Sequence, residues 1–315
     1  MKVGFVSLVG RPNVGKSTLL NTILDMKLAI TSDKAGTTRN IINGIYNDDD
    51  SQIIFVDTPG IHKPLNKLEV LMNRKSYSST DDVDVILFVV DAKTGIGKGD
   101  KEILERLKKT EAHVFLILNK IDRMSNKEIF KQIVNCKDLY PFEEVIPISA
   151  LNKKNVDELI STIKKYLNEE ERIFSEDELT NVSLRFIMAE FVREKVLMLT
   201  HAEVPHTVTC YTEKYEEDEN IVNISVLIVV ERDNLKKIII GKRGQMLKEI
   251  GTRASHDMEE FLGKKVYLET YVKTLKNWRD EEKYFLELGL KDDELKISKI
   301  TTILIEVIFM KEIAW

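Results

Sequence analysis

The chain has 315 residues, of which 43% are hydrophobic and 31% are charged, and its formal net charge is −5. This length predicts two globular domains, each able to bury its own core. The net negative charge excludes wholesale coating of nucleic acid but leaves room for a local basic patch. Cys136 and Cys210 lie far apart without a CxxC spacing, which excludes a disulfide or zinc framework and favours a reducing cytoplasm.

The first half alternates apolar and amphipathic segments, as expected of a doubly wound α/β sheet. The apolar start, Val3–Val9, runs straight into a glycine-rich loop without a cleavage region, so it predicts a first strand and not a signal peptide. An acidic turn at residues 48–51 joins Ile41–Tyr46 to Ile53–Val56 and predicts an antiparallel hairpin. The other elements expected here are a helix at Thr18–Leu28, strands at Val85–Val90, His113–Leu118 and Val145–Ile148, and a helix at Asp157–Leu167.

Residues 10–17, GRPNVGKS, match the phosphate-binding pattern GxxxxGK[ST] between a predicted strand and a predicted helix. Glycines let the backbone aim several N–H groups at phosphate oxygens, and the helix N-terminus adds its positive dipole end. Lys16 is expected on the β- and γ-phosphates, and the Ser17 hydroxyl on Mg²⁺. The nucleotide contacts expected from this segment are Gly10, Asn13, Val14, Gly15, Lys16, Ser17 and Thr18.

Two short motifs, each after a predicted strand, specify the base. In the NKID sequence at residues 119–122, the Asp122 carboxylate can accept from both N1–H and the 2-amino group of guanine. Adenine lacks both donors and would leave this carboxylate unpaired, so a site built in this way favours GTP over ATP. In the SAL sequence at residues 149–151, the N–H of Ala150 is expected to donate to guanine O6. The residues expected around guanine are Asn119, Lys120, Asp122, Ser149, Ala150 and Leu151.

The DTPG sequence at residues 57–60 predicts the segment that senses the γ-phosphate. Asp57 is expected to hold Mg²⁺ through water, and the Gly60 amide to contact the γ-phosphate. In the preceding AGTTR sequence at residues 35–39, Thr38 is expected to bind Mg²⁺ in the GTP state, with Thr37 as the alternative. Loss of the γ-phosphate would disorder both segments. The Mg²⁺ ligands predicted are therefore Ser17, Thr38 and Asp57.

Ile61 stands where many GTPases carry the glutamine that orients the attacking water. Isoleucine cannot hydrogen-bond water, so intrinsic hydrolysis is expected to be slow or organised differently. Our hypothesis is that the amide oxygen of Asn13 binds K⁺ against the phosphates and replaces an arginine finger, a group worth on the order of 10³–10⁵ in rate. The alternative is that Asn13 bonds only its own loop. The catalytic residues predicted are Lys16, Asn13, Thr38 and Gly60.

The second half predicts a smaller α+β domain. Acidic residues after position 168 predict a linker, assigned to 171–183, between a domain at 1–170 and a domain at 184–290. The second domain is expected to run helix, strand, strand, helix, loop, helix, strand. The segments that carry this order are Leu184–Leu199, His206–Tyr215, Ile221–Glu231, the GKRG sequence at 241–244, Gln245–Leu262 and Lys265–Val272.

The GKRG sequence follows the pattern of a GxxG loop, which clamps about four nucleotides of single-stranded RNA in KH domains. Two glycines that bracket two cations at a helix start allow a nucleic-acid backbone to approach closely. An ordinary helix-capping turn is the alternative. Tyr271, Trp278, Tyr284 and Phe285 are expected in the core more often than in stacks with bases. The RNA-binding residues predicted are Lys237, Gly241, Lys242, Arg243, Gly244 and Lys248.

Taken together, GRPNVGKSTLLN, KAGTTRN, DTPGIH, NKID and SAL resemble the Era family of bacterial GTPases, and the KH-like half separates the chain from related tandem-GTPase and tRNA-modifying proteins. The resemblance implies a P-loop GTPase domain followed by a type II KH domain. It further implies that the protein binds GTP, GDP and Mg²⁺, and small-subunit ribosomal RNA near its 3′ end. A checkpoint in 30S subunit assembly follows from it, as does peripheral association with the inner membrane face. We expect a cytoplasmic monomer.

Two points stay open at the level of sequence. An RNA-binding scaffold with little GTP turnover is the alternative function because of Ile61, and an ATP-dependent enzyme is a distant third. Residues 291–315 depart from the family pattern. Their apolar stretch is too short and too interrupted to span a bilayer, and we assign them no function.

Overall fold

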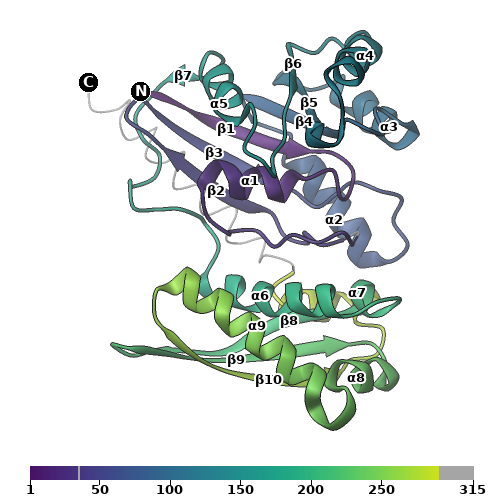
Figure 1. Ribbon diagram of the computed structural model, residues 1–315, viewed down its shortest axis with the longest axis vertical. Coiled ribbons are helices and arrows are strands. Elements are labelled where there is room, and N and C mark those ends of the chain that lie inside the picture. The colour runs from purple at the N-terminus through teal and green to yellow at the C-terminus, as the bar shows by residue number, and fades with distance from the viewer. Residues whose placement is uncertain (35, 291–315) are drawn as a thin grey trace.

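The computed structural model describes residues 1–34 and 36–290, which form two domains (Figure 1). Ala35 and the predicted extension at 291–315 lie outside the described residues. The first domain is built on a sheet with the order β2-β3-β1-β4-β5-β6, and β7 pairs with β1. The strands are β1 Lys2–Val9, β2 Ile42–Asn47, β3 Ser51–Asp57, β4 Val85–Asp91, β5 His113–Asn119, β6 Glu144–Pro147 and β7 Asn168–Glu169.

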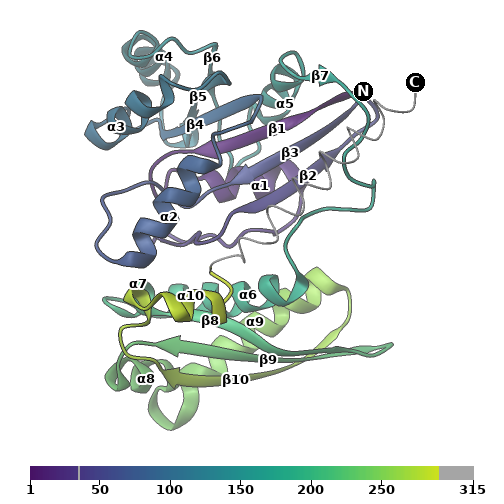
Figure 2. The same cartoon turned by 180° about the vertical axis from the view of Figure 1, so that it is seen from behind.

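Strands β1, β3, β4, β5 and β6 pair in parallel, and β2 pairs antiparallel with β3, as the predicted hairpin requires. Helices cover both faces of this sheet (Figures 1 and 2). Alternate residues of β4 show why: Val85, Leu87 and Val89 pack in one core cluster, whereas Ile86, Phe88 and Val90 pack in another. The helices are α1 Lys16–Leu24, α2 Lys67–Ser78, α3 Lys98–Leu107, α4 Asn126–Cys136 and α5 Val156–Lys164.

The second domain has a three-stranded sheet, in which β9 pairs antiparallel with β8 and parallel with β10. Helices α6 and α9 lie on one face of the sheet, and α6 faces the first domain (Figure 1). The predicted order of a type II KH domain is therefore confirmed. The elements are α6 Leu184–Leu199, α7 Val204–Thr207, β8 Thr209–Glu217, β9 Ile221–Val230, α8 Asp233–Ile240, α9 Gln245–Leu262, β10 Lys265–Thr274 and α10 Glu282–Glu287.

Two of the element boundaries that differ from the prediction have a clear local cause. Helix α1 ends at Leu24, not Leu28, because Asp25 adopts a left-handed conformation with φ 52°. The strand predicted from His206 begins only at Thr209, because Pro205 helps to start the short helix α7. Apolar alternation alone does not distinguish such a helical turn from the beginning of a strand.

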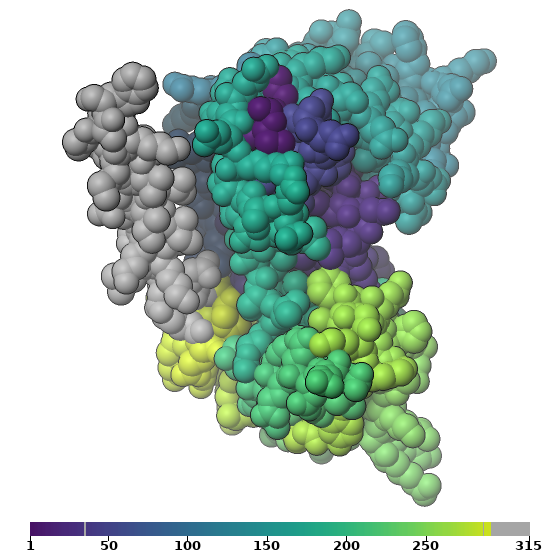
Figure 3. Space-filling model, turned by 90° about the vertical axis from the view of Figure 1, so that its left-hand side faces the viewer, coloured from purple at the N-terminus to yellow at the C-terminus, as the bar shows by residue number. Residues whose placement is uncertain are grey.

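The linker is attached to the first domain along its length. The N–H of Ile45 donates to the carbonyl of Leu179 at 2.9 Å, and the Thr180 hydroxyl donates to the carbonyl of Asn43 at 2.7 Å. Gln52 in β3 accepts from the N–H groups of Ile173 and Phe174. Figure 3 shows this segment lying on the surface of the first domain. Within residues 1–34 and 36–290, no helix combines the length and apolarity needed to cross a membrane.

Candidate nucleotide site and RNA-binding loop

The phosphate-binding loop joins β1 to α1, at the carboxyl end of the central strand. Its glycines at 10 and 15 have φ values of +154° and +101°, and a Cβ on either would lie within 2.4 Å of a neighbouring atom. Lys16 is buried, and its ammonium donates to the carbonyls of Gly10 and Arg11 at 3.0 and 3.1 Å. Burial lowers the pKa of Lys16 to about 8, against the opposing charge of Asp57. The loop therefore holds a cation whose own solvation is poor and which an anionic phosphate would stabilise.

The predicted Mg²⁺ ligands meet beside this loop. The Ser17 hydroxyl donates to Asp57 Oδ2 at 2.7 Å and lies 2.9 Å from Thr38 Oγ1. Asp57 is fully buried, and among the described residues its Oδ1 has no hydrogen-bond partner. Burial raises the pKa of Asp57 to about 6, although the charge of Lys16 and the bond from Ser17 oppose the rise. Clustered hard oxygen donors with an unsatisfied carboxylate oxygen fit Mg²⁺.

The choice between the two threonines follows from their hydrogen bonds. The Thr37 hydroxyl donates to the carbonyl of Lys34 at 2.7 Å, within its own loop. Thr38 is the one whose hydroxyl contacts Ser17. The geometry thus supports Thr38 as the ligand and assigns Thr37 to the structure of its own loop.

The segment after Asp57 is packed against the phosphate loop. A Cβ on Gly60 would lie 2.6 Å from the Pro12 nitrogen, so only glycine fits there. Ile61 is buried, and its N–H donates to the carbonyl of Gly10 at 3.2 Å. The side chain of Ile61 belongs to the core cluster under α3 and does not face the phosphates. The position that usually orients water is therefore part of the hydrophobic core in this protein.

Asn13 is exposed and has a left-handed conformation with φ 64°. Its amide nitrogen donates to the carbonyl of Asp33 at 2.7 Å, in the segment that carries Thr38. This bond extends beyond the phosphate loop, unlike the alternative considered above. Because the nitrogen is the donor, the amide oxygen of Asn13 stays available as a cation ligand.

The predicted guanine motifs are tied to the phosphate loop by hydrogen bonds. Asn119 donates to the carbonyl of Val14 at 2.9 Å, and Lys120 donates to the carbonyl of Asn13 at 2.6 Å. Lys120 also pairs with Asp91 at the end of β4, at 2.9 Å. Sequence reasoning missed Asp91, although its place after an apolar strand could have indicated it. These bonds fix the base site relative to the phosphate site.

The Asp122 carboxylate, which is predicted to read the base, is positioned by a hydroxyl. Ser149 donates to Asp122 Oδ1 at 2.6 Å, which orients the carboxylate. The N–H of Ala150, expected on guanine O6, donates to Asn119 Oδ1 at 3.0 Å in this structure. Guanine would share or replace that bond. Leu151 is 73% exposed beside Ala150. Thr18, which completes the predicted contacts, lies in the first turn of α1 and lines the phosphate pocket.

The GKRG loop connects α8 to α9 in the second domain. Gly241 has φ +72°, and a Cβ there would lie 2.6 Å from the Met246 Cβ, whereas Gly244 has φ +77° with open space around it. Arg243 is also left-handed, with φ 52°. The four predicted RNA-binding cations all expose their side chains, and they are Lys237, Lys242, Arg243 and Lys248. The structure therefore places the predicted residues on one exposed loop with its flanking helices.

Comparison with known proteins agrees with both sites. A family model described as a 50S ribosome-binding GTPase matches residues 5–120, and a KH domain model matches residues 203–279. A crystal structure of Era in complex with MgGDPNP and nucleotides 1506–1542 of 16S ribosomal RNA is 44% identical to this chain. The match covers 93% of this chain and 100% of the Era chain, with a TM-score of 0.90. The chain belongs to the Era family.

A second Era structure supports this assignment. A variant of Era from Aquifex aeolicus bound to GDP and AlF4⁻ is 43% identical, covers 93% of this chain and 100% of that chain, and has a TM-score of 0.89. The predicted Era family and its fold, a P-loop GTPase domain followed by a KH domain, are therefore confirmed. The protein is a GTPase that uses GTP, GDP and Mg²⁺, as the sequence analysis predicted.

In this Era-family chain, the segment that carries Thr38 is bound to the KH domain. The Arg193 guanidinium in α6 is fully buried, donates to the carbonyl of Thr37 and pairs with Glu190. Its neighbour Glu194 is also fully buried and accepts from the N–H of Thr31 at 3.0 Å. A helix of the KH domain thus contacts the segment that carries Thr38 at both Thr31 and Thr37.

Further contacts extend this interface between the GTPase and KH domains to α2. Arg39 donates to the carbonyl of Val208 at 2.6 Å and lies over the ring of Trp278. Leu68 and Met72 of α2 pack in one cluster with Trp278 and with Phe285, Leu288 and Leu290. Trp278 and Phe285 are therefore core residues, as expected, whereas Tyr271 is 50% exposed. Sequence reasoning missed Arg193 and Glu194, because no local motif marks them.

Proposed function

We propose that this protein is a GTP-hydrolysing, RNA-binding switch that binds small-subunit ribosomal RNA near its 3′ end and acts in assembly of the 30S subunit. The observation that carries this proposal is the match along 93% of the chain to Era bound to both MgGDPNP and 16S ribosomal RNA. The 50S description belongs to a model that covers only part of the GTPase domain. The KH domain and the 16S complex favour the small subunit.

The GTPase domain supplies positioning and charge for hydrolysis. Lys16 would contact the β- and γ-phosphates, and exchange its carbonyl partners for phosphate oxygens. Ser17, Thr38 and Asp57 would hold Mg²⁺, which neutralises charge that develops on the phosphates. Asp122, oriented by Ser149, would accept from the guanine edge. Each group is held by other residues, so little reorganisation accompanies the reaction.

The water-orienting function cannot come from Ile61, which is buried. We therefore keep K⁺ at Asn13 as part of the proposal. It is supported by the bond from Asn13 to Asp33 and by the Asn13 amide oxygen, which accepts no hydrogen bond from the described residues. The test is the rate of GTP hydrolysis in potassium and in sodium buffers. A faster rate in potassium, lost in Asn13→Ala, is expected. Equal rates in both buffers would contradict this part of the proposal.

Coupling between the nucleotide site and the GKRG loop would run through the interface between the GTPase and KH domains. Thr38 contacts Ser17 at the Mg²⁺ ligands, and the adjacent Thr37 carbonyl accepts from Arg193. Release of Thr38 after hydrolysis would therefore also change the surroundings of α6, which packs against α9 behind the GKRG loop. By linkage, if the bound nucleotide changes RNA affinity by a given factor, bound RNA must change nucleotide affinity by the same factor.

The proposal also covers the ribosomal subunit that the protein binds, its location in the cell and its oligomeric state. Resemblance to Era supports binding to the 30S subunit itself, a cytoplasmic location and peripheral association with the inner membrane face. We also propose that the protein acts as a monomer. Sedimentation of the purified chain, and its distribution between ribosomal, membrane and soluble fractions, would test these points.

The RNA target is tested by crosslinking in cells and sequencing the attached RNA. The matched variant is Lys242→Asp with Arg243→Asp, which reverses the loop charge and leaves both loop glycines unchanged. Gly241→Asp is less suitable, because its Cβ would clash with Met246. We expect reads at the 3′ end of small-subunit ribosomal RNA that disappear in the variant. Scattered reads that the variant does not change would contradict RNA binding by this loop. RNA binding without measurable GTP turnover would favour the scaffold alternative.

A further inference from the structure

A groove on the GTPase domain lies outside both sites described so far. It runs between α2 and α3, has a volume of about 1020 Å³, and is floored by Ile61 and Ile103. Its lining contains more cations than acids: six lysines and arginines face only Asp81 and Glu102. The six cations are Arg11, Lys63, Arg74, Lys98, Arg106 and Lys109. This excess is notable because the whole chain has a net charge of −5.

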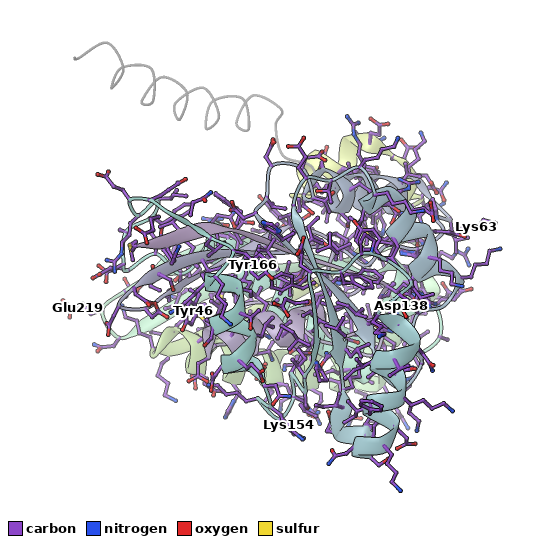
Figure 4. The ribbon with its side chains drawn as sticks, turned by 90° about the horizontal axis from the view of Figure 1, so that it is seen from above. Tyr46, Lys63, Asp138, Lys154, Tyr166 and Glu219 are labelled. Atoms are coloured by element: carbon purple, nitrogen blue, oxygen red, sulfur yellow. The ribbon has the colours of Figure 1, made fainter. Side chains whose placement is uncertain are left out.

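The six cations of the groove are exposed, and few of them form ion pairs with described residues. All six side chains are exposed. Among the described residues, only Arg11 pairs with a carboxylate, at 3.6 Å from Asp100. Figure 4 shows Lys63 projecting outward from its loop. The Arg106 guanidinium lies 4.0 Å from the centre of the Tyr77 ring, which holds the guanidinium plane while leaving its N–H edges open.

The groove is also in contact with the nucleotide-sensing machinery. Arg11 belongs to the phosphate loop, and its carbonyl accepts from Lys16 at 3.1 Å. His62 and Lys63 lie two and three residues after Gly60, the glycine predicted to contact the γ-phosphate, and a nitrogen of the His62 ring lies 2.9 Å from the Gly60 carbonyl oxygen. The groove is therefore lined by the two segments that respond to the nucleotide. Anything that fills it would be sensitive to GTP state.

We propose that this groove binds the phosphodiester backbone of RNA, as a second contact beyond the GKRG loop. Clustered cations in a concave surface focus the electrostatic field and concentrate a polyanion. Exposed guanidinium groups suit phosphate oxygens in particular. The inference rests on the proposed function, because the KH domain already brings RNA to the protein. The α2 residues of the groove follow the start of that helix, where the N–H of Lys67, outside the groove lining, donates to Asp280 at 3.1 Å.

The test compares salt dependence of RNA binding among matched variants. The groove variant is Lys63→Glu with Arg74→Glu. The control is Lys131→Glu on α4 with Lys137→Glu just after the end of that helix, which changes net charge equally and lies outside the groove. The probe is a fluorescent RNA with the sequence of 16S nucleotides 1506–1542, used in the Era complex. Anisotropy titrations over a range of KCl concentrations give the slope of log K against log[KCl].

We expect the slope of log K against log[KCl] to become less negative by about 1.4–1.8 in the groove variant, since each phosphate contact contributes about −0.7 to −0.9 and two are lost. The ratio of GTP hydrolysis rates with and without RNA should also be smaller in this variant than in the control. A slope equal to that of the control would overturn the inference. If Lys242→Asp with Arg243→Asp weakens binding in the same experiment, only the groove has failed. If that variant also binds like the control, the proposed RNA function has failed as well.

Anionic lipid is the other polyanion to exclude. Sedimentation with vesicles of phosphatidylcholine and phosphatidylglycerol measures it directly. Loss of vesicle binding in the groove variant, together with an unchanged slope for RNA, would assign the groove to a membrane surface and overturn the RNA inference. Equal vesicle binding by the variant and the wild-type chain, together with a reduced slope for RNA, would support it.

Discussion

The nucleotide site and the GKRG loop use charge in opposite ways. Lys16 and Asp57 are buried and hydrogen-bonded to neighbours that hold them in place. Lys242 and Arg243 stand exposed on a loop whose shape is set by two glycines. A buried charge discriminates by geometry and tolerates little change, whereas an exposed charge attracts a polyanion over a distance and is screened by salt. Mutations in the two regions should therefore be measured by different experiments.

The contact that joins the two regions should give the largest effect. Arg193→Ala leaves Glu190 buried without its partner, which is expected to cost about 3–5 kcal/mol of unfolding free energy. Chemical denaturation of the full chain measures this loss. Arg185→Ala on the same helix is the control, because Arg185 is exposed and should change stability by less than about 0.5 kcal/mol. Similar losses in both variants would mean that the interface contact is not specific.

Lys16→Met separates catalysis from stability in the nucleotide site. We expect kcat for GTP hydrolysis to fall by about 10²–10³, the usual loss for a donor aimed at developing charge. The unfolding free energy of the nucleotide-free protein should change little. Burial already disfavours the Lys16 charge, as its pKa of about 8 indicates. Lys131→Met on exposed α4 is the matched control. A strong loss of stability without loss of kcat would reverse this interpretation.

Lys242→Ala with Arg243→Ala should show the opposite profile. We expect RNA affinity to fall with a salt slope reduced by about 1.4, from two phosphate contacts to single-stranded RNA. Stability and basal GTP hydrolysis should stay at their wild-type values, because both side chains are exposed. The measurement is RNA titration at several salt concentrations, with GTP hydrolysis measured in parallel. A change in basal hydrolysis would show that the loop and the nucleotide site are coupled without RNA.

The smallest effect on stability is expected from Asp257, an acidic residue at the interface between the domains. Asp257 pairs with Lys27 of the GTPase domain at 2.6 Å and also with Lys195. Burial alone would raise the pKa of Asp257, but these two lysines outweigh it and lower the pKa. A lowered pKa contributes stability above the unfolded value of about 3.9, and this contribution is lost as pH falls through the folded value.

We expect Asp257→Asn to cost below about 1 kcal/mol at neutral pH, since the pair is partly exposed. The difference between wild type and variant should shrink as the pH is lowered below about 4, the ordinary range of the carboxyl group. Denaturation curves at neutral and acidic pH measure this difference. A difference that grows on acidification would contradict the sign of the pKa shift.

Contiguous motifs explain why the nucleotide site was predictable. The phosphate loop, DTPG, NKID and SAL each begin at or just after the end of a strand, so the sequence order already places them at one edge of the sheet. The choice between Thr37 and Thr38, in contrast, needed the structure, because it depends on which hydroxyl turns toward Ser17. Residue type and spacing are the same for both.

Contacts between domains could not be predicted from local pattern. Arg193 and Glu194 lie on an amphipathic helix and read as ordinary charged residues until the GTPase domain buries them. The groove between α2 and α3 is similar, since its cations are drawn from segments far apart in the sequence. Trp278 was expected in the core, but its neighbours on α2 belong to the other domain. These features depend on how two folded units dock.

The linker has a consequence for handling the GTPase domain alone. Strand β2 is the outer strand of its sheet, and Gly44 pairs with Thr180 across its open edge. The linker thus covers backbone N–H and C=O groups that would otherwise be available to a strand from another molecule. A GTPase domain cut at residue 170 would expose this edge, and we expect it to self-associate by edge-to-edge pairing. One that extends to residue 183 should stay dispersed at the same concentration.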